Sequence, residues 1–531
     1  MLRVLLVTSE AYPLAKSGGL ADAVSGLAHA IQQAGAEVTI LMPGYRPALQ
    51  RLAGAREVAS LPDLPGGPAT LVAGKVAQLN VPILLLRSDA LYDRSGGLYL
   101  DAHGKEFADN DLRFAALSHA AAAIAAGKTI LPIPHVVHAN DWHAGLTPLL
   151  LKAAGLSRIK TVLTIHNLAF QGLFPLERAE ELGIPPAWRG PEGVECWGRM
   201  SFMKAGLAHA DRITTVSHTY AREILTPEHG MGLDELLRSR EQDLIAIPNG
   251  IDTDIWNPAL DTLLQHHYSA HDLTGKTACK RELQQVFGLE IDEAATVLVS
   301  GSRLTTQKMA DVAVEALPQL LDQHARLQVA VLGCGDESIE SALASLARRY
   351  PGRLNVHLGY DEHRAHLLHA GGDILLHGSR FEPFGLTPLY AMLYGTIPVC
   401  SAVGGMMDTV TDAHPGTLEH ATGILFEDDT TAAMVAAVER ALELRRQPKV
   451  WRRLQCNGML RAFGWEEPAA MYLELYRSLA PIHVKVPAPQ PPRRRQLMRT
   501  PPSVPEVHTH GIAAARQRSR QWLEPPVTVP L

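Results

Sequence analysis

Short apolar runs alternate with helical patterns along most of the chain. The first run, from Leu2 to Thr8, lacks the alternation of polar and apolar residues that marks a half-exposed strand. A loop that contains Gly18 and Gly19 follows, and apolar residues then recur at helical spacing from Leu20 to Ile31. Because this unit of strand, loop and helix is repeated, the pattern predicts parallel sheets buried on both faces, as in the α/β class.

The predicted strands form two series that are separated near residue 250. The first series comprises residues 2–8, 37–42, two extended segments within 69–87 that suit a hairpin, and residues 135–139, 160–165, 212–216 and 244–247. The second series comprises residues 295–300, 327–332, 354–358, 373–376 and 397–400. Since the second series starts anew, we expect two doubly wound, Rossmann-like domains. The predicted boundaries are residues 1–245 and 246–460 for these domains and 461–479 for a final helix.

Residues 480–531 have a different composition. They are rich in proline, contain the run Arg493 to Arg495, and have little periodic apolar content. Such a segment buries too little apolar surface to fold by itself, so we expect a disordered or polyproline-like tail. Its basic run is either a solvated extension or a contact for an anionic partner.

Composition narrows the classes of function. The 49 basic and 55 acidic residues give a net charge of −6, which argues against nucleic acid as a partner. The five cysteines are scattered without paired spacing, which favours a reducing cytoplasm and argues against a zinc site. Ser9 and Glu10 interrupt the N-terminal apolar run too early for a secretory signal, and no run is long enough to span a bilayer. We therefore expect a cytoplasmic protein without a membrane partner.

Candidate chemistry gathers where predicted strands end and helices begin. The stretch from His377 to Tyr390 follows a buried strand and runs into an apolar helix, and ligands of open α/β sheets bind at this edge. Glu382 offers an acceptor for sugar hydroxyls there, while Gly385 and Thr387 begin a helix whose free N–H groups can hold a phosphate. A capped helix start beside a solvated glutamate is the alternative.

Cations stand at two further helix entrances. Lys16 precedes the double-glycine turn, and Arg303 and Lys308 flank the entrance of the helix predicted at 310–321. Positive charge at a helix N-terminus suits a diphosphate. The loop at Lys16 matches neither a dinucleotide fingerprint nor a Walker loop, so an ordinary glycine turn is the alternative there.

Two strands of the first series end in polar residues. One is followed by Asn140, Asp141 and His143, and the next by His166 and Asn167. A single histidine is more often structural than functional, but two such strand ends indicate a shared cleft.

Asp252 and Asp254 form an Asp-x-Asp pair, which can hold a divalent cation against a nucleotide diphosphate. Because lysine and arginine already stand at the helix entrances, and because such triplets arise often by chance, we predict no metal site.

Seven motifs occur along the chain in one order. They are Lys-x-Gly-Gly-Leu at 16–20, Asn-Asp-Trp-His-Ala-Gly-Leu at 140–146, Thr-Ile-His-Asn-Leu-Ala-Phe-Gln-Gly at 164–172, Asn-Gly-Ile-Asp at 249–252, Ser-Arg-Leu-x-x-Gln-Lys at 302–308, Ser-Arg-Phe-Glu-Pro at 379–383 and Gly-Gly-x-x-Asp-Thr-Val at 404–410. Through these motifs, residues 1–479 resemble bacterial glycogen synthase and plant starch synthase, which are retaining glycosyltransferases of the two-domain GT-B fold.

The resemblance implies a reaction in the cleft between the two domains, without a cofactor. The first domain would bind the growing α-1,4-glucan of glycogen or a maltodextrin, the second would bind ADP-glucose, and the final helix would cross back to the first. The glucan 4-hydroxyl would attack on the face that ADP vacates and give its proton to phosphate, so that no protein base is needed.

The resemblance also assigns roles to individual residues. Arg303 and Lys308 would hold the diphosphate, and Glu382 would accept hydrogen bonds from glucose hydroxyls. With His166, which would contact the transferred glucose, they are the predicted catalytic residues. The predicted substrate-binding residues are Lys16, Gly18, Gly19, Asp22, Asp141, His143, Asn167, Asn249, Tyr360, Gly385, Leu386 and Thr387. Of these, Tyr360 would stack on the adenine, and the loop at Lys16 would close over the phosphates.

Three positions depart from the common family pattern. Met309, Phe384 and Pro388 stand where the family often has glycine, cysteine and glutamine. We expect them to alter the wall of the sugar pocket and so to bear on donor or acceptor preference.

Other readings of the sequence lead to different functions. A related GT-B glycosyltransferase could use another nucleotide sugar, and a catalytically silent glucan-binding protein is the alternative outside enzymes. A glucan phosphorylase is disfavoured because no lysine has a recognisable pyridoxal phosphate setting. The sequence does not indicate which oligomeric state the protein adopts.

Overall fold

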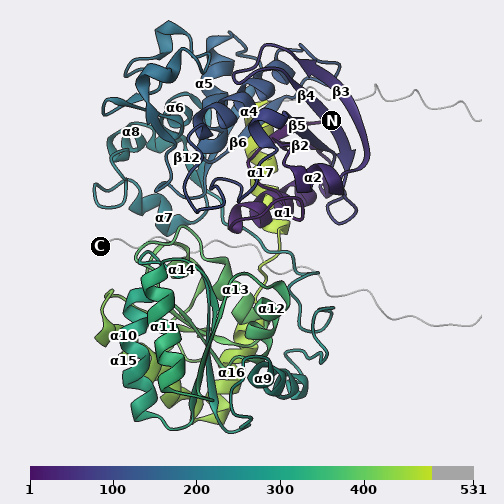
Figure 1. Ribbon diagram of the computed structural model, residues 1–531. Helices are drawn as coiled ribbons and strands as arrows, with labels where there is room; N and C mark the ends of the chain where they lie inside the picture. Colours follow the sequence, from purple (N-terminus) through teal and green to yellow (C-terminus); the bar gives the residue numbers. More distant parts are fainter. Residues whose placement is uncertain (481–531) are drawn as a thin grey trace, which may run out of the picture. The chain divides into compact units, whose positions relative to one another are not determined.

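The computed structural model describes residues 1–480, which form two α/β halves with separate parallel sheets (Figure 1). The sheet of the first half has the strand order β12-β11-β7-β6-β1-β2-β5-β4-β3. Its strands are β1 Arg3–Val7, β2 Glu37–Pro43, β3 Ala53–Leu61, β4 Ala69–Lys75, β5 Ile83–Arg87, β6 Val136–Asn140, β7 Lys160–Ile165, β11 Arg212–Thr215 and β12 Leu244–Ala246. The strands from β12 to β5 are parallel, and β4 and β3 add an antiparallel edge.

The sheet of the second half is wholly parallel, with the order β15-β14-β13-β16-β17-β18. Its strands are β13 Thr296–Gly301, β14 Leu327–Gly333, β15 Leu354–Leu358, β16 Ile374–His377, β17 Ile397–Ser401 and β18 Ile424–Phe426. A small antiparallel sheet in the first half comprises β8 Leu173–Pro175, β9 Glu195–Cys196 and β10 Arg199–Ser201.

Helices connect the parallel strands in both halves. Those of the first half are α1 Gly19–Gln33, α2 Arg46–Arg51, α3 Asp89–Tyr92, α4 Asn110–Ala125, α5 Leu146–Ala153, α6 Phe202–His209, α7 His218–Glu223 and α8 Asp234–Ser239. The later helices are α9 Thr274–Val286, α10 Ala310–Gln323, α11 Glu337–Arg349, α12 Glu362–Gly371, α13 Leu386–Leu393, α14 Gly404–Thr409, α15 Thr431–Arg445, α16 Pro448–Met459 and α17 Glu466–Leu479. Short 3-10 helices lie at Trp142–Ala144, Leu176–Ala179, Pro186–Trp188 and Glu241–Asp243.

Each parallel sheet is buried on both faces, as the continuous apolar runs predict. In β13, Leu298 packs into one hydrophobic core, while Val297 and Val299 pack into another on the opposite face. Alternate residues of a strand point to opposite faces, so a strand that is apolar at every position requires both cores.

In each sheet, strand order reverses beside the first strand. β1 lies between β2 and β6, and β13 lies between β14 and β16. Because the connections leave in opposite directions at such a point, a crevice opens outside the carboxyl ends of the two central strands. Each half therefore offers one crevice for a ligand.

The predicted fold class is confirmed, and the extended segments within 69–87 are the antiparallel pair β4 and β5. Strand β3 and the small sheet are missing from the sequence prediction. β3 is exposed along most of its length, so it lacks the apolar run by which the other strands are recognised. The predicted boundaries at residues 245, 460 and 479 stay predictions, and the predicted tail lies, apart from Ala480, outside the described residues.

Helix α17 packs into the core of the first half, although it follows the second half in sequence (Figure 1). Trp465, at its start, fills the space beside Gly26 of α1, where a Cβ atom would lie 2.0 Å from the indole nitrogen. Further along, the Tyr476 hydroxyl lies 2.7 Å from Nδ1 of the buried His138 in β6. Within residues 1–480, no helix combines the length and apolar character needed to cross a bilayer.

Tyr476→Phe tests the anchoring of α17. The variant leaves Nδ1 of His138 buried without its partner, so we expect the free energy of unfolding to fall by about 1–3 kcal/mol. Urea unfolding followed by circular dichroism measures the change. Tyr472→Phe is the matched control, because its hydroxyl lies 3.4 Å from both Thr164 and Thr214, and those two hydroxyls bond each other at 2.6 Å. Equal losses in the two variants would contradict a specific role for the bond to His138.

Candidate active site

The reversal point of the second sheet brings Lys308 and Glu382 together. Lys308 lies in the loop after β13, and Glu382 lies in the loop after β16, which pairs with β13. The Lys308 ammonium forms an ion pair with the Glu382 carboxylate, and the two side chains are only 12% and 11% exposed. Nε2 of His377 lies 3.4 Å from the same carboxylate oxygen.

Opposing effects act on the Glu382 carboxylate. Burial raises its pKa, but Lys308 and His377 outweigh burial and lower the pKa to about 2. Burial also lowers the pKa of His377. Glu382 is therefore ionised near neutral pH, and it serves as a hydrogen-bond acceptor rather than as a proton donor.

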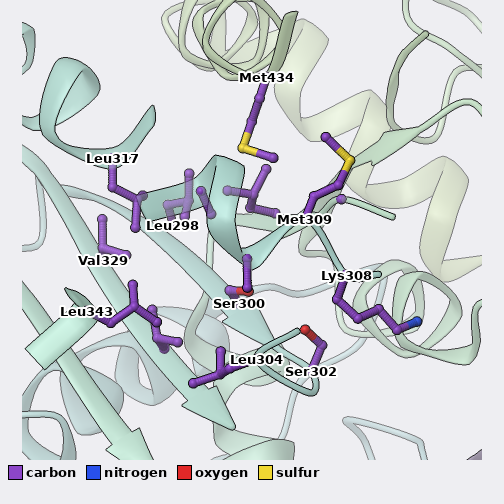
Figure 2. A pocket seen from close by; sticks show the side chains of 15 residues that line it. Leu298, Ser300, Ser302, Leu304, Lys308, Met309, Leu317, Val329, Leu343 and Met434 are labelled. Carbon is purple, nitrogen blue, oxygen red and sulfur yellow. The ribbon is translucent and has the colours of Figure 1, made fainter. Parts of the chain in front are cut away.

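The side chain of Lys308 is directed away from a small apolar cavity behind its loop (Figure 2). This cavity measures about 20 Å³, which is room for about one water molecule and far too little for a sugar. Leu298 and Met434 are among the residues that line it. The Lys308 ammonium therefore lies on the Glu382 side of the loop, away from this cavity.

The three departures from the family pattern are buried. Met309 is fully buried beside the apolar cavity and holds a left-handed backbone, with φ of 49°, at the start of α10. Phe384 is 4% exposed, and Pro388 is buried in the first turn of α13. Their side chains fill the interior, so any influence on substrate preference acts through the position of the backbone.

Arg303 lies on the exposed side of the same loop. Its guanidinium donates to Oε1 of Gln307 at 3.0 Å. The side-chain amide of Gln307 donates through Nε2 to the carbonyl of Phe381 at 3.3 Å. Gln307 thus links Arg303 to the residue before Glu382. The two cations of this loop therefore differ, because Lys308 is paired and buried whereas Arg303 reaches solvent.

Gly385, Leu386 and Thr387 form the start of α13. Gly385 is its N-cap, with φ of 86°, and it has no side chain with which to cap the first turn. A Cβ atom at this position would lie 3.3 Å from the Cγ atom of Glu382. The first-turn N–H groups of α13 therefore lie beside the Lys308–Glu382 pair, where a phosphate can accept from them.

The loop at Lys16 reaches the start of α13. A Cβ atom at Gly19 would lie 3.1 Å from Cδ1 of Leu386. The Lys16 ammonium forms an ion pair with Asp22 at 3.0 Å and lies 5.8 Å from the centre of the Tyr360 ring. A cation of the first half, Lys16, is thus carried by a loop that reaches the start of α13.

Glu10, which sequence reasoning missed, organises this loop. It lies beyond the end of β1 and is 2% exposed. Its carboxylate accepts from the amide and the hydroxyl of Ser17, each at 2.6 Å, from the amide of Gly18 at 3.4 Å, and from the hydroxyl of Tyr99 at 2.5 Å. Its place at a strand's carboxyl end was the available signal, the same one that singled out Glu382.

Asp141, His166 and Asn167 come together at the ends of β6 and β7. The Asp141 carboxylate accepts from the amide of His166 at 2.7 Å and from the amide of Asn167 at 3.2 Å. Burial raises the pKa of Asp141 to about 7, although these amides work against it. Burial lowers the pKa of His166 to about 3, and Nε2 of its ring lies 3.0 Å from Oδ1 of Asn140.

His143 and Asn249 have different surroundings from the other predicted residues. His143 is buried in an aromatic cluster, with its ring stacked on Tyr99 and on Trp142. Asn249 lies where the chain passes into the second half, next to Gly250, whose Cβ atom would lie 2.7 Å from the carbonyl of Gly464. The ring of His143 is thus engaged in packing within the protein, and the role predicted for Asn249 stays a prediction.

Asp252 of the Asp-x-Asp pair accepts from the amides of Asp254 at 3.0 Å and Ile255 at 3.3 Å. These bonds give its carboxylate a turn-forming role. The prediction that no metal is bound there stays a prediction.

Comparisons with known proteins agree with this architecture. The family described as the starch synthase catalytic domain matches residues 3–239, and the family described as glycosyl transferases group 1 matches residues 282–454. Sucrose-phosphate synthase from Thermosynechococcus elongatus, at 19% identity and a TM-score of 0.58 over 90% of this chain and 99% of that chain, shares the fold. The fold and these matches define a glycosyltransferase of the GT-B class.

More similar proteins narrow this class. Glycogen synthase from Bordetella petrii is 56% identical over 494 residues, which cover 91% of this chain and 94% of that protein. Glycogen synthase from Ralstonia nicotianae is 54% identical over 520 residues, which cover 98% and 95%. The catalytic domain of starch synthase IV from Arabidopsis thaliana, bound to ADP and acarbose, has a TM-score of 0.83 at 28% identity, covering 91% of this chain and 100% of that chain. The chain belongs to the glycogen synthase family.

Asp141→Asn separates the charge of this residue from its role as an acceptor. The pKa of Asp141 is raised from 3.8 to about 7 in the folded protein. Between about pH 4 and pH 7, the folded protein therefore keeps a proton on this carboxyl that the unfolded chain has released. Wild-type stability therefore falls as pH rises from about 4 to about 7. Asparagine keeps an acceptor oxygen, tolerates the positive φ of 54° that Asp141 adopts, and escapes this loss. We expect the unfolding free energy of the variant, relative to wild type, to rise across this range in urea titrations. A difference that is constant with pH would contradict the raised pKa.

Proposed function

We propose that this enzyme transfers glucose from ADP-glucose to the non-reducing end of an α-1,4-glucan, with retention of configuration and without a cofactor. The observation that carries the proposal is the buried Lys308–Glu382 pair beside the first turn of α13. This arrangement offers cations and N–H groups for a diphosphate next to a carboxylate for sugar hydroxyls. The similarity to a starch synthase bound to ADP and acarbose supports the same pair of substrates.

The donor diphosphate would lie among Lys16, Arg303, Lys308 and the start of α13. The bond between the glucosyl C1 and the diphosphate oxygen breaks with its electron pair on ADP, and C1 gains oxocarbenium character. Lys308 and Arg303 stabilise the charge that develops on the departing ADP. Phosphate oxygens take over Lys308 from Glu382, which leaves the carboxylate to accept hydrogen bonds from the glucose hydroxyls.

The acceptor reacts on the face that ADP leaves. The 4-hydroxyl oxygen of the glucan bonds to C1, and its proton passes to a phosphate oxygen of ADP. His166 is neutral, because burial lowers its pKa to about 3, and its role is to hydrogen-bond the transferred glucose. Glu382, whose pKa is lowered to about 2, is a weak base, and in this proposal the proton goes to the departing phosphate, as the resemblance to the family implies.

Another nucleotide sugar is the alternative donor. Tyr360, the residue assigned to the base, is 68% exposed and presents a flat ring, which stacks on any nucleobase. Stacking on this ring alone therefore does not select adenine over another base.

Glucose transfer to glycogen from ADP-glucose and from UDP-glucose, each in EDTA, tests the donor. We expect incorporation from ADP-glucose to exceed that from UDP-glucose by about tenfold or more, because a base-specific site leaves polar groups unpaired with the wrong base. Nucleotide release and incorporation into polymer are measured together. Activity that disappears in EDTA would contradict the prediction that Asp252 and Asp254 bind no metal. Folded protein that transfers glucose from neither donor would overturn the proposal.

Lys308→Ala tests the charge that faces the leaving group. We expect kcat to fall by about 100-fold to 1000-fold, since one preorganised charge at the developing anion is lost. Lys449→Ala, at an exposed lysine of α16, is the control and should leave kcat unchanged. Because Lys308→Ala strands a buried carboxylate, the double variant Lys308→Met/Glu382→Gln removes both charges and should fold yet stay inactive. Activity near wild type in either Lys308 variant would exclude the assigned role.

A further inference from the structure

Two short helices from different halves, α7 and α14, exchange hydrogen bonds. Near the end of α7, the Glu223 carboxylate accepts from the amide of Gly404 at 2.9 Å, at the first residue of α14. Near the end of α14, the Asp408 carboxylate accepts from the amide of Thr219 at 3.0 Å and from its hydroxyl at 2.6 Å, in the first turn of α7. Each helix thus supplies an anionic acceptor for first-turn N–H groups of the other.

The same contact reaches the backbone around Glu382. Gly404 packs so closely on it that a Cβ atom would lie 1.7 Å from the carbonyl oxygen of Glu382, and the amide of Gly405 donates to that oxygen at 3.3 Å. From the other side, the hydroxyl of Ser217, the N-cap of α7, donates to the carbonyl of Pro383 at 2.7 Å and is fully buried. The loop between β16 and α13, residues 378–385, carries Glu382 and is called the catalytic loop below. Two of its neighbouring carbonyls are therefore held through α7 and α14.

Helix α7 also touches the acceptor side of the site. The hydroxyl of Tyr220 accepts from the amide of Leu168 at 3.0 Å, in the loop that begins at His166. Burial, and then the charges of Asp141, Glu223 and Glu382, raise the pKa of Tyr220. One helix thus contacts the surroundings of both candidate substrate sites.

We propose that Glu223, supported by Ser217 and Asp408, is a positioning residue that holds Glu382 in its productive place when the two halves are docked. Glu223 belongs to the half that carries His166, whereas Gly404 belongs to the half that carries Glu382. Docking of the halves therefore completes the support of the catalytic loop. This inference rests on the proposed role of Glu382 in glucose transfer and names residues outside that role.

Glu223→Ala in the full chain removes the acceptor of the Gly404 amide. A hydrogen bond to a charged acceptor is worth enough that its loss should lower kcat about tenfold or more, with a smaller change in KM for ADP-glucose. Glu223→Gln keeps an oxygen acceptor and should retain most of the activity. Glu228→Ala, at an exposed glutamate shortly after α7, is the matched control and should behave as wild type.

Hydrogen–deuterium exchange gives a readout that is independent of activity. We expect Glu223→Ala, and also Asp408→Ala, to speed exchange in peptides that cover residues 380–386 and 404–409, while Glu223→Gln and Glu228→Ala leave it unchanged. Unaltered exchange in the 380–386 peptide of Glu223→Ala, or an equal loss of kcat in Glu223→Gln, would overturn the proposal. A wild-type protein without transferase activity would refute the proposed function alone, since the exchange comparison still decides whether Glu223 supports the loop.

Discussion

The buried ion pair between Lys308 and Glu382 is the interaction on which the site depends. Two charges withdrawn from water are tolerated only when each has a close partner, and the second sheet provides this by placing β13 beside β16. The loops after these strands are distant in sequence but meet because strand order reverses there. In the first sheet, strand order reverses beside β1 in the same way, where the loop after β1 carries Lys16 and the end of the neighbouring β6 carries Asp141, so one rule of topology positions candidate residues in both halves.

The two sides of the proposed site, one for the donor and one for the acceptor, differ in electrostatic character. On the donor side, cations surround an ionised carboxylate, since the pKa of Glu382 is lowered to about 2. On the acceptor side, burial holds His166 neutral and raises the pKa of Asp141 to about 7. This division suits the proposed anionic donor and neutral polysaccharide, because cations stabilise phosphate charge, whereas the neutral His166 hydrogen-bonds sugar hydroxyls at a smaller desolvation cost.

Sequence patterns predicted the elements that are apolar and regular, and the polar residues at strand ends. Lys16, Asp141 and Glu382 were recognisable because each lies in the segment between a predicted buried strand and the next helix. The exposed β3 lacked such a pattern. The contacts of Glu10 with Tyr99 and of Ser217 with Pro383 were beyond prediction for another reason. They join residues remote in sequence, and only the packed fold shows which polar groups meet. His143 had the right place in a motif, yet aromatic packing buries its ring.

The hydrogen bonds of Glu10 have a consequence for the affinity of the site. They fix Ser17 and Gly18 to the end of β1 in the protein alone, with Tyr99 as a further support. A flexible glycine loop loses conformational entropy when a ligand orders it, and that loss weakens binding. Here this part of the loop is ordered during folding, so its entropy is lost before any ligand arrives. The attraction of Lys16 for a phosphate is then opposed less by the freezing of its own loop.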